Sequence, residues 1–112
     1  MPYIKLQCNI TIPDKEELIK SLSSLVADEL GKPETYVMVV LEDAVEMLMS
    51  GSKEPTAFVE LKSLSLPENS TTELSNSICN FLQEKLDILP VRIYINFTNV
   101  ERHMWGWDDG TF

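Results

Sequence analysis

Apolar residues recur along this chain at two spacings, and the two alternate. Residues 3–8 alternate in polarity and are rich in strand-forming residues, and residues 37–42, 57–64 and 91–97 also read as strands. Between them lie two stretches with apolar residues every three or four positions, which predicts amphipathic helices. The first helical stripe holds Leu18, Leu22, Leu25, Val26 and Leu30, and the second holds Leu74, Ile78, Phe81, Leu82 and Leu86.

The ends of the predicted helices carry the expected signals. Asp14 precedes the first helix as its N-cap, and Glu17 follows three residues later. Gly31 ends that helix, and Pro33 prevents it from resuming. Residues 67–70 form a turn and cap before the second helix. Each helix is therefore bounded by its own sequence.

The second half of the chain repeats the plan of the first. At an offset of 56 residues, the pair Glu17–Leu18 matches Glu73–Leu74, and the two helical stripes coincide. We therefore predict an α+β fold of two layers, in which two βαβ units form a four-stranded sheet with both helices on one face. The run from Val37 to Leu41 is apolar on both sides of its strand. The second face of the sheet therefore also needs cover, and oligomerisation would supply it.

Composition restricts the class of protein further. The 112 residues make a single domain spanning 1–112, with 18 acidic and 9 basic residues and a net charge of −9. Nucleic acid is thus not expected as a partner, because phosphate contacts need clustered Lys and Arg. No segment predicts a membrane span or a signal peptide, so we expect a cytoplasmic protein whose Cys8 and Cys79 are reduced. The chain has no cluster of His and Cys residues that would indicate a metal site, and we expect no cofactor.

The second residue is the strongest candidate for chemistry. Pro2 is small enough to allow removal of Met1, after which the chain would begin with a secondary amine. An α-amino group titrates near ~8, and an apolar pocket or a nearby cation lowers its pKa further. Such an amine would be a general base at neutral pH without any catalytic side chain.

Five further motifs occur in a fixed order after this proline: residues 31–36 (GKPETY), 54–55 (EP), 61–64 (LKSL), 92–96 (RIYIN) and 106–112 (GWDDGTF). Over essentially its whole length the chain resembles the macrophage migration inhibitory factor family of the tautomerase superfamily. The resemblance implies a homotrimer in which three sheets wrap into a barrel, with active sites at the subunit interfaces. It also implies that the tail after residue 104 forms short strands that pair with a neighbouring subunit.

The resemblance assigns roles around Pro2. It implies keto–enol tautomerisation of phenylpyruvate-like α-keto acids, with Pro2 as general base and Lys32 binding the substrate carboxylate. Lys32 would also lower the pKa of Pro2. Matching positions place Ser63 and the backbone of Leu64 beside the proline. The neighbouring subunit would supply Tyr94 as an aromatic wall and Asn96 as a hydrogen-bond donor, while the pocket would be lined by Tyr36, Trp107 and Phe112.

The chain departs from the animal cytokines of this family at three pocket positions. Tyr3 replaces a methionine, Lys62 replaces a histidine and adds positive charge, and Trp105 replaces a smaller residue and would narrow the pocket mouth. His103 is expected at the surface of the tail.

Two alternative functions stay open. One is a cytokine-like protein that binds a receptor, retains residual tautomerase activity and leaves the cell without a signal peptide. The other is dehalogenation or hydration, which in related proteins uses pocket arginines. Only Arg92 and Arg102 are present here, and Arg92 would share the pocket side of its strand with Tyr94.

Overall fold

A computed structural model describes residues 1–112. Its main elements are β1 (Tyr3–Cys8), α1 (Lys15–Leu30), β2 (Met38–Glu42), β3 (Ala57–Leu64), α2 (Thr71–Leu86) and β4 (Ile93–Val100). Two short strands follow, β5 (Gly106–Trp107) and β6 (Gly110–Thr111). Every predicted helix and strand is therefore present, and the two βαβ units follow one another along the chain.

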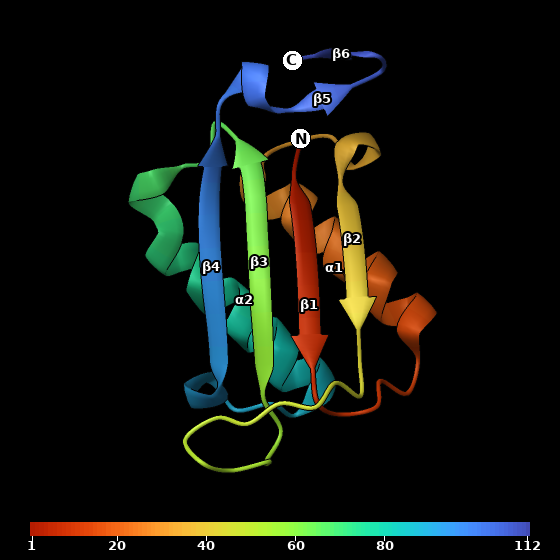
Figure 1. Ribbon diagram of the computed structural model, residues 1–112, viewed down its shortest axis with the longest axis vertical. Coiled ribbons are helices and arrows are strands. Elements are labelled where there is room, and N and C mark those ends of the chain that lie inside the picture. The colour runs from red at the N-terminus through yellow and green to blue at the C-terminus, as the bar shows by residue number, and fades with distance from the viewer.

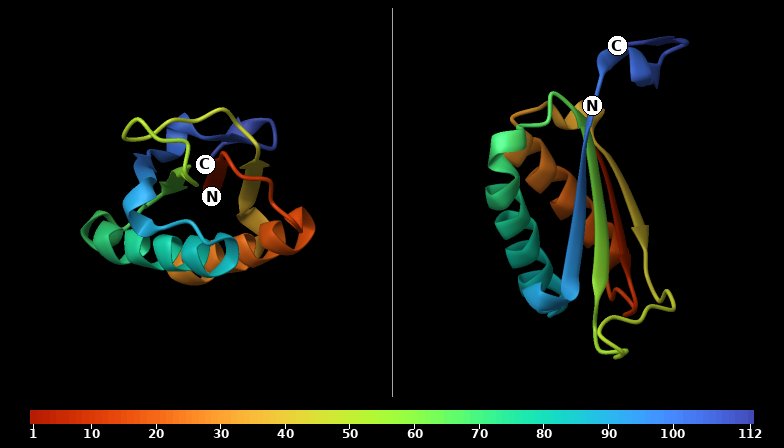
Figure 2. Two further views of the ribbon diagram at one scale, coloured as in Figure 1. Left: turned by 90° about the horizontal axis from the view of Figure 1, so that it is seen from below. Right: turned by 60° about the vertical axis from the view of Figure 1, so that its left-hand side comes forward.

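The four long strands form one sheet in the order β2-β1-β3-β4. Within each βαβ unit the two strands are parallel, and the central strands β1 and β3 join the units in antiparallel register. Both helices cover the same face of this sheet (Figures 1 and 2). The predicted two-layer α+β architecture is confirmed.

The core lies between the sheet and the helices, because alternate strand residues point to that side. In β1 these are Ile4, Leu6 and Cys8, all fully buried. The helices pack against these strand residues through the two predicted apolar stripes. The most buried stripe residues are Leu18, Leu22 and Val26 in α1 and Leu74, Ile78 and Leu82 in α2.

The ends of α1 match the sequence signals closely. The Asp14 side chain accepts a hydrogen bond from the backbone N–H of Glu17 at 3.1 Å. At the other end Gly31 adopts a left-handed conformation with φ of 62°, which favours glycine. The start of α2 differs from the expectation. Residues 68–70 form a short 3₁₀ turn, and Ser70 makes no capping hydrogen bond through its side chain.

Two strand boundaries differ from the prediction. β4 begins at Ile93 rather than at residue 91, because Pro90–Arg92 form a 3₁₀ turn, and it continues to Val100. β2 begins at Met38 rather than at residue 37. Since β2 is an edge strand, its residues are half-buried or exposed, although its sequence is apolar on both sides.

The face of the sheet away from the helices is not covered within the chain (Figure 2), and it is more polar than expected. Lys5 of β1 forms an ion pair with Glu42 of β2 at 3.1 Å, and Gln7 donates to the same carboxylate at 2.9 Å. Met38 on this face is nevertheless 61% exposed. We call this surface the open face.

The tail folds over the end of the sheet at which the chain begins (Figure 1). Its strands β5 and β6 pair with each other in antiparallel register, and the N–H of Phe112 donates to the carbonyl of Trp105 at 3.2 Å. The short strands were predicted, whereas their pairing within the same chain was not. No helix in the structure has both the length and the apolar character needed to cross a membrane.

Replacing Leu82 by alanine tests the packing between α2 and the sheet. Leu82 is only 1% exposed, and its truncation leaves a cavity in the core, so we expect a loss of about 2–5 kcal/mol in the free energy of unfolding. Urea denaturation at fixed protein concentration measures this loss. Glu84→Ala, at an exposed position of the same helix, is the control and should change little. Equal effects of the two substitutions would contradict this core.

Candidate functional site

Pro2 lies at the end of a strand in the middle of the sheet. Its carbonyl accepts a hydrogen bond from the N–H of Met38 at 3.0 Å, which ties the start of β1 to the start of β2. Its ring is less than 2% exposed. A proline suits this place because the first residue of a strand needs no N–H for the ladder.

A cavity of about 300 Å³ opens beside Pro2. Its walls come from the start of the chain, the 3₁₀ turn Glu34–Tyr36, the start of β2 and the tail. Most of the lining is apolar, and the residues are Met1, Pro2, Tyr3, Thr35, Tyr36, Val37, Met38, Trp105, Gly106, Trp107 and Phe112. The structure therefore brings Pro2 together with five of the predicted pocket residues: Tyr3, Tyr36, Trp105, Trp107 and Phe112.

Three aromatic rings build one wall of this cavity. Trp107 stacks on Phe112 with ring centroids 5.2 Å apart, and Tyr36 meets Trp107 edge-on at 6.0 Å. Such contacts stabilise ring positions beyond simple area burial. The wall connects the turn after α1 to the end of the chain, so the tail is part of the cavity.

The amine at the start of the chain has an unusual environment. The pKa of the Met1 amino group is lowered, first by burial and second by the positive charge of Lys32. Both causes disfavour the ammonium form. The amine belongs to Met1 in this chain, and the nitrogen of Pro2 is an amide. Removal of Met1 would turn the Pro2 nitrogen into the N-terminal amine, one residue closer to the start of β1 and beside the same cavity.

Lys32, Ser63 and Leu64 form a separate group that does not line the cavity. The ammonium of Lys32 donates to the carbonyl of Leu64 at 2.7 Å, and the hydroxyl of Ser63 donates to the same oxygen at 2.9 Å. Ser63 is fully buried. Lys32 therefore acts on the amine through its charge, while Leu64 holds the ammonium in place through its backbone.

Tyr94 and Asn96 share the open face of β4, as their spacing predicted, but they lie away from Pro2 within this chain. In the register of the sheet, Lys62 of β3 lies opposite Tyr3 of β1 on one side and opposite Thr98 of β4 on the other. Asn96 and Tyr94 lie two and four residues before Thr98, which is about 7 Å and 13 Å along the strand. Tyr94 is 65% exposed.

Arg92 does not lie on the pocket side, and that expectation was wrong. Its guanidinium donates to the carbonyls of Met49, Ser52, Glu54 and Pro55, a loop at the opposite end of β3 from Lys62. Arg102 donates to the carbonyl of Phe112 in the tail at 3.2 Å. His103 is exposed, as expected, and its imidazole lies 3.5 Å from the Glu101 carboxylate. Neither arginine lines the cavity beside Pro2 or the cavity on the open face.

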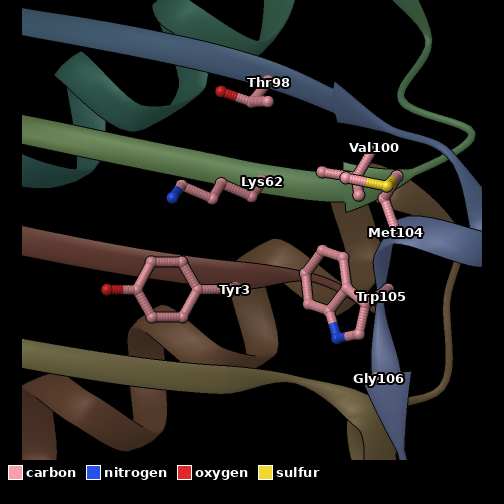
Figure 3. A pocket seen from close by; sticks show the side chains of 7 residues that line it. All are labelled: Tyr3, Lys62, Thr98, Val100, Met104, Trp105 and Gly106. Atoms are coloured by element: carbon pink, nitrogen blue, oxygen red, sulfur yellow. The ribbon is translucent and has the colours of Figure 1, made fainter. Parts of the chain in front are cut away.

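A second cavity of about 450 Å³ lies on the open face, and sequence reasoning missed it (Figure 3). It contains Lys62, which the sequence had placed in the pocket of Pro2, and it shares Tyr3, Trp105 and Gly106 with that pocket. Thr98, Val100 and Met104 complete it. Strand alternation could have indicated Thr98 and Val100. The folding back of Met104 depends on the tail and has no local signal.

Comparison with known proteins agrees with this architecture. The family model for macrophage migration inhibitory factor matches residues 1–112. The chain belongs to this family. It is 34% identical to the homolog from Trichinella spiralis, over all of both chains. It is 32% identical to the factor from Meriones unguiculatus, over all of this chain and 99% of that protein.

Solved structures of the family share the fold. The crystal structure of the homologue from Prochlorococcus marinus has a TM-score of 0.93 and 41% identity, and the match covers 98% of each chain. The structure from Trichinella spiralis has a TM-score of 0.92 and 31% identity, covering 98% of this chain and 99% of that one. The resemblance to the tautomerase superfamily drawn from the sequence is thus confirmed.

Replacing Lys32 by glutamine should raise the pKa of the N-terminal amine. Lys32 disfavours the ammonium form, so its removal should move the pKa towards its ordinary value while burial still holds it below that value. The pH dependence of amine acylation, or NMR titration, measures this pKa. Lys62→Gln is the matched control, because the charge of Lys62 does not contribute to the lowered pKa. An unchanged pKa in Lys32→Gln would rule out the electrostatic role of Lys32.

Proposed function

We propose that this chain, after removal of Met1, is a tautomerase acting on phenylpyruvate-like α-keto acids, with the amine of Pro2 as general base. The observation that carries this proposal is the environment of the N-terminal amine, whose pKa is lowered by burial and by Lys32. A base works best when its pKa lies near the working pH. A lowered pKa leaves a larger fraction of the amine neutral at a given pH, and the neutral amine has a free lone pair to accept a proton.

The proposed reaction moves one proton. The Pro2 amine takes a proton from the carbon next to the substrate carbonyl, and the electrons of that C–H bond form the enol double bond. The π electrons of the carbonyl move to its oxygen, which then takes the proton from the Pro2 ammonium and restores the neutral amine. The apolar cavity suits the aromatic ring of such a substrate, with Tyr36, Trp107 and Phe112 as its wall. Lys32 would attract the substrate carboxylate.

We further propose that the working form is a homotrimer, in which an adjacent subunit brings Tyr94 and Asn96 to each Pro2. Three features support this arrangement: the open face has no cover within the chain, Tyr94 on it is largely exposed, and both edge strands are free. Asn96 would then donate a hydrogen bond to the substrate carboxylate. Ser63 and the backbone of Leu64 would stand beside the site and position Lys32.

Activity should depend on the N-terminus. Protein whose intact mass shows loss of Met1 should catalyse enol–keto conversion of phenylpyruvate, whereas protein that retains Met1 should be inactive because its Pro2 nitrogen is an amide. The Pro2→Gly variant should lose most activity while keeping the fold. Equal turnover with and without Met1 would contradict the role of Pro2. An inactive, correctly processed trimer would favour receptor binding instead.

The rate should also rise with pH as the Pro2 ammonium loses its proton. A lowered pKa places this rise below the ordinary range of an α-amino group, and Lys32→Gln should move it to higher pH. A pH profile of kcat/KM for the processed protein measures the shift. The control is Lys20→Gln, because Lys20 is exposed on α1 and pairs only with Glu16. A profile that stays in place in Lys32→Gln would contradict the proposal.

Mixed trimers test the shared site. Pro2→Gly and Asn96→Ala each damage a different part of it, so each variant alone should be weakly active. After joint unfolding and refolding in equal amounts, roughly a quarter of the sites should combine an intact Pro2 with an intact Asn96, because each site draws on two subunits. Activity should therefore recover on mixing. No recovery, with trimers shown by light scattering, would place both residues in the same subunit's site.

A further inference from the structure

The bond between Met1 and Pro2 lies against the packed part of the molecule. The Pro2 ring, which contains the nitrogen of this bond, is less than 2% exposed. The carbonyl of Pro2 accepts a hydrogen bond from the N–H of Met38 at 3.0 Å. The next residue, Tyr3, already lies between Met38 of β2 and Lys62 of β3 in the register of the sheet. No free segment therefore separates Met1 from the sheet.

The tail adds a cover over this end of the sheet (Figure 1). Met1 lines the cavity beside Pro2 together with Trp105, Trp107 and Phe112 of the tail. The stacked rings of Trp107 and Phe112 stabilise this cover. Burial in these surroundings is also the first cause of the lowered pKa of the Met1 amino group. An enzyme that approaches Met1 would thus meet the tail as well as the sheet.

Removal of Met1 is a hydrolysis. Water adds to the Met1 carbonyl, the bond to the Pro2 nitrogen breaks, and that nitrogen takes up a proton and becomes an amine. An aminopeptidase must bring its catalytic groups into contact with the carbonyl, so the residues on both sides of the bond have to enter its active site. Burial and hydrogen bonding of the backbone decide whether a terminus can be trimmed. Pro2 can leave its place only if its bond to Met38 and the start of β1 are given up.

β1 cannot open by itself at a small cost in free energy. It is a central strand with a partner on each side, and its residues Ile4, Leu6 and Cys8 are fully buried in the core. Core strands open with free energies close to that of global unfolding, whereas fraying termini open at almost no cost. The start of this chain therefore becomes accessible when the whole domain unfolds.

We propose that Met1 can be removed only from the unfolded chain, so that a folded chain which retains Met1 stays in a blocked form. Folding and processing then compete for the same terminus. In the blocked form the Pro2 nitrogen is an amide, and Met1 takes up part of the cavity that the ring of a substrate would need. That the blocked form is inactive rests on the proposed function, whereas the order of processing and folding does not.

Intact mass spectrometry tests this order without any measurement of activity. Folded protein that retains Met1 is incubated with a methionine aminopeptidase, and the loss of one methionine is followed in time. A synthetic peptide of residues 1–12 is the accessible substrate. The peptide should lose Met1 about a thousandfold or more faster than the folded protein, because only a small fraction of a stable domain is unfolded at any time. Similar rates for the two would overturn the proposal, and so would a peptide that is not trimmed.

Substitutions far from the terminus separate unfolding of the whole domain from local opening. Leu82 lies in α2 and does not line the cavity beside Pro2, so Leu82→Ala can speed the removal of Met1 only through unfolding. The rate should rise about thirtyfold or more, in step with the unfolded fraction measured by urea denaturation. Glu84→Ala, at an exposed position of the same helix, is the matched control and should leave the rate unchanged. Trp107→Ala loosens the tail and should raise the rate only as far as it lowers overall stability.

Two results with these variants would contradict the proposal. Equal rates in Leu82→Ala and in the unsubstituted chain would mean that the first residues detach locally. A large acceleration in Trp107→Ala without an equal loss of stability would make the tail alone the barrier. A failure of the proposed function would look different: Met1 would leave only the unfolded chain, but the processed and refolded protein would not convert phenylpyruvate.

Discussion

The central position of β1 is the constraint on which the site depends. β1 lies between β2 and β3, so the first residues of the chain are fixed from both sides, by Met38 on one strand and Lys62 on the other. A terminal residue is normally mobile. Here Pro2 is buried and its carbonyl is bonded to Met38. A backbone amine can therefore be held in position as firmly as a catalytic side chain.

The sheet has one buried face and one open face, and the two have different tasks. The buried face holds the apolar core against both helices and accounts for the fold of the single chain. The open face mixes ion pairs with exposed large residues such as Met38 and Tyr94. In the trimer that we propose, the subunits would meet through this mixed surface, while the apolar core lies on the opposite face of the sheet.

The lysines of this acidic chain are unevenly paired with carboxylates. Ion pairs neutralise most of the lysines, which leaves the net charge of −9 spread over the surface. Lys32 and Lys62 remain near the start of β1 without a carboxylate. One acts on the N-terminal amine, and the other stands in the floor of the second cavity. In an otherwise acidic molecule, the two lysines without a carboxylate partner therefore lie at the same end of the sheet.

The sequence by itself determined the elements and the core, because alternation and helical spacing are local patterns that decide which side of an element becomes buried. The stripe from Leu18 to Leu30, the cap at Asp14 and the end at Gly31 could all be read in this way. The order of the motifs also pointed to Pro2 as the candidate base, which stays a prediction. Only the tertiary structure decided which distant residues lie together. In it, Arg92 contacts the loop at the far end of β3, and β5 pairs with β6. Lys32 binds the carbonyl of Leu64, and the expected pocket is divided into two cavities. These outcomes depend on strand register and on the path of the tail, for which no short stretch of sequence carries a signal.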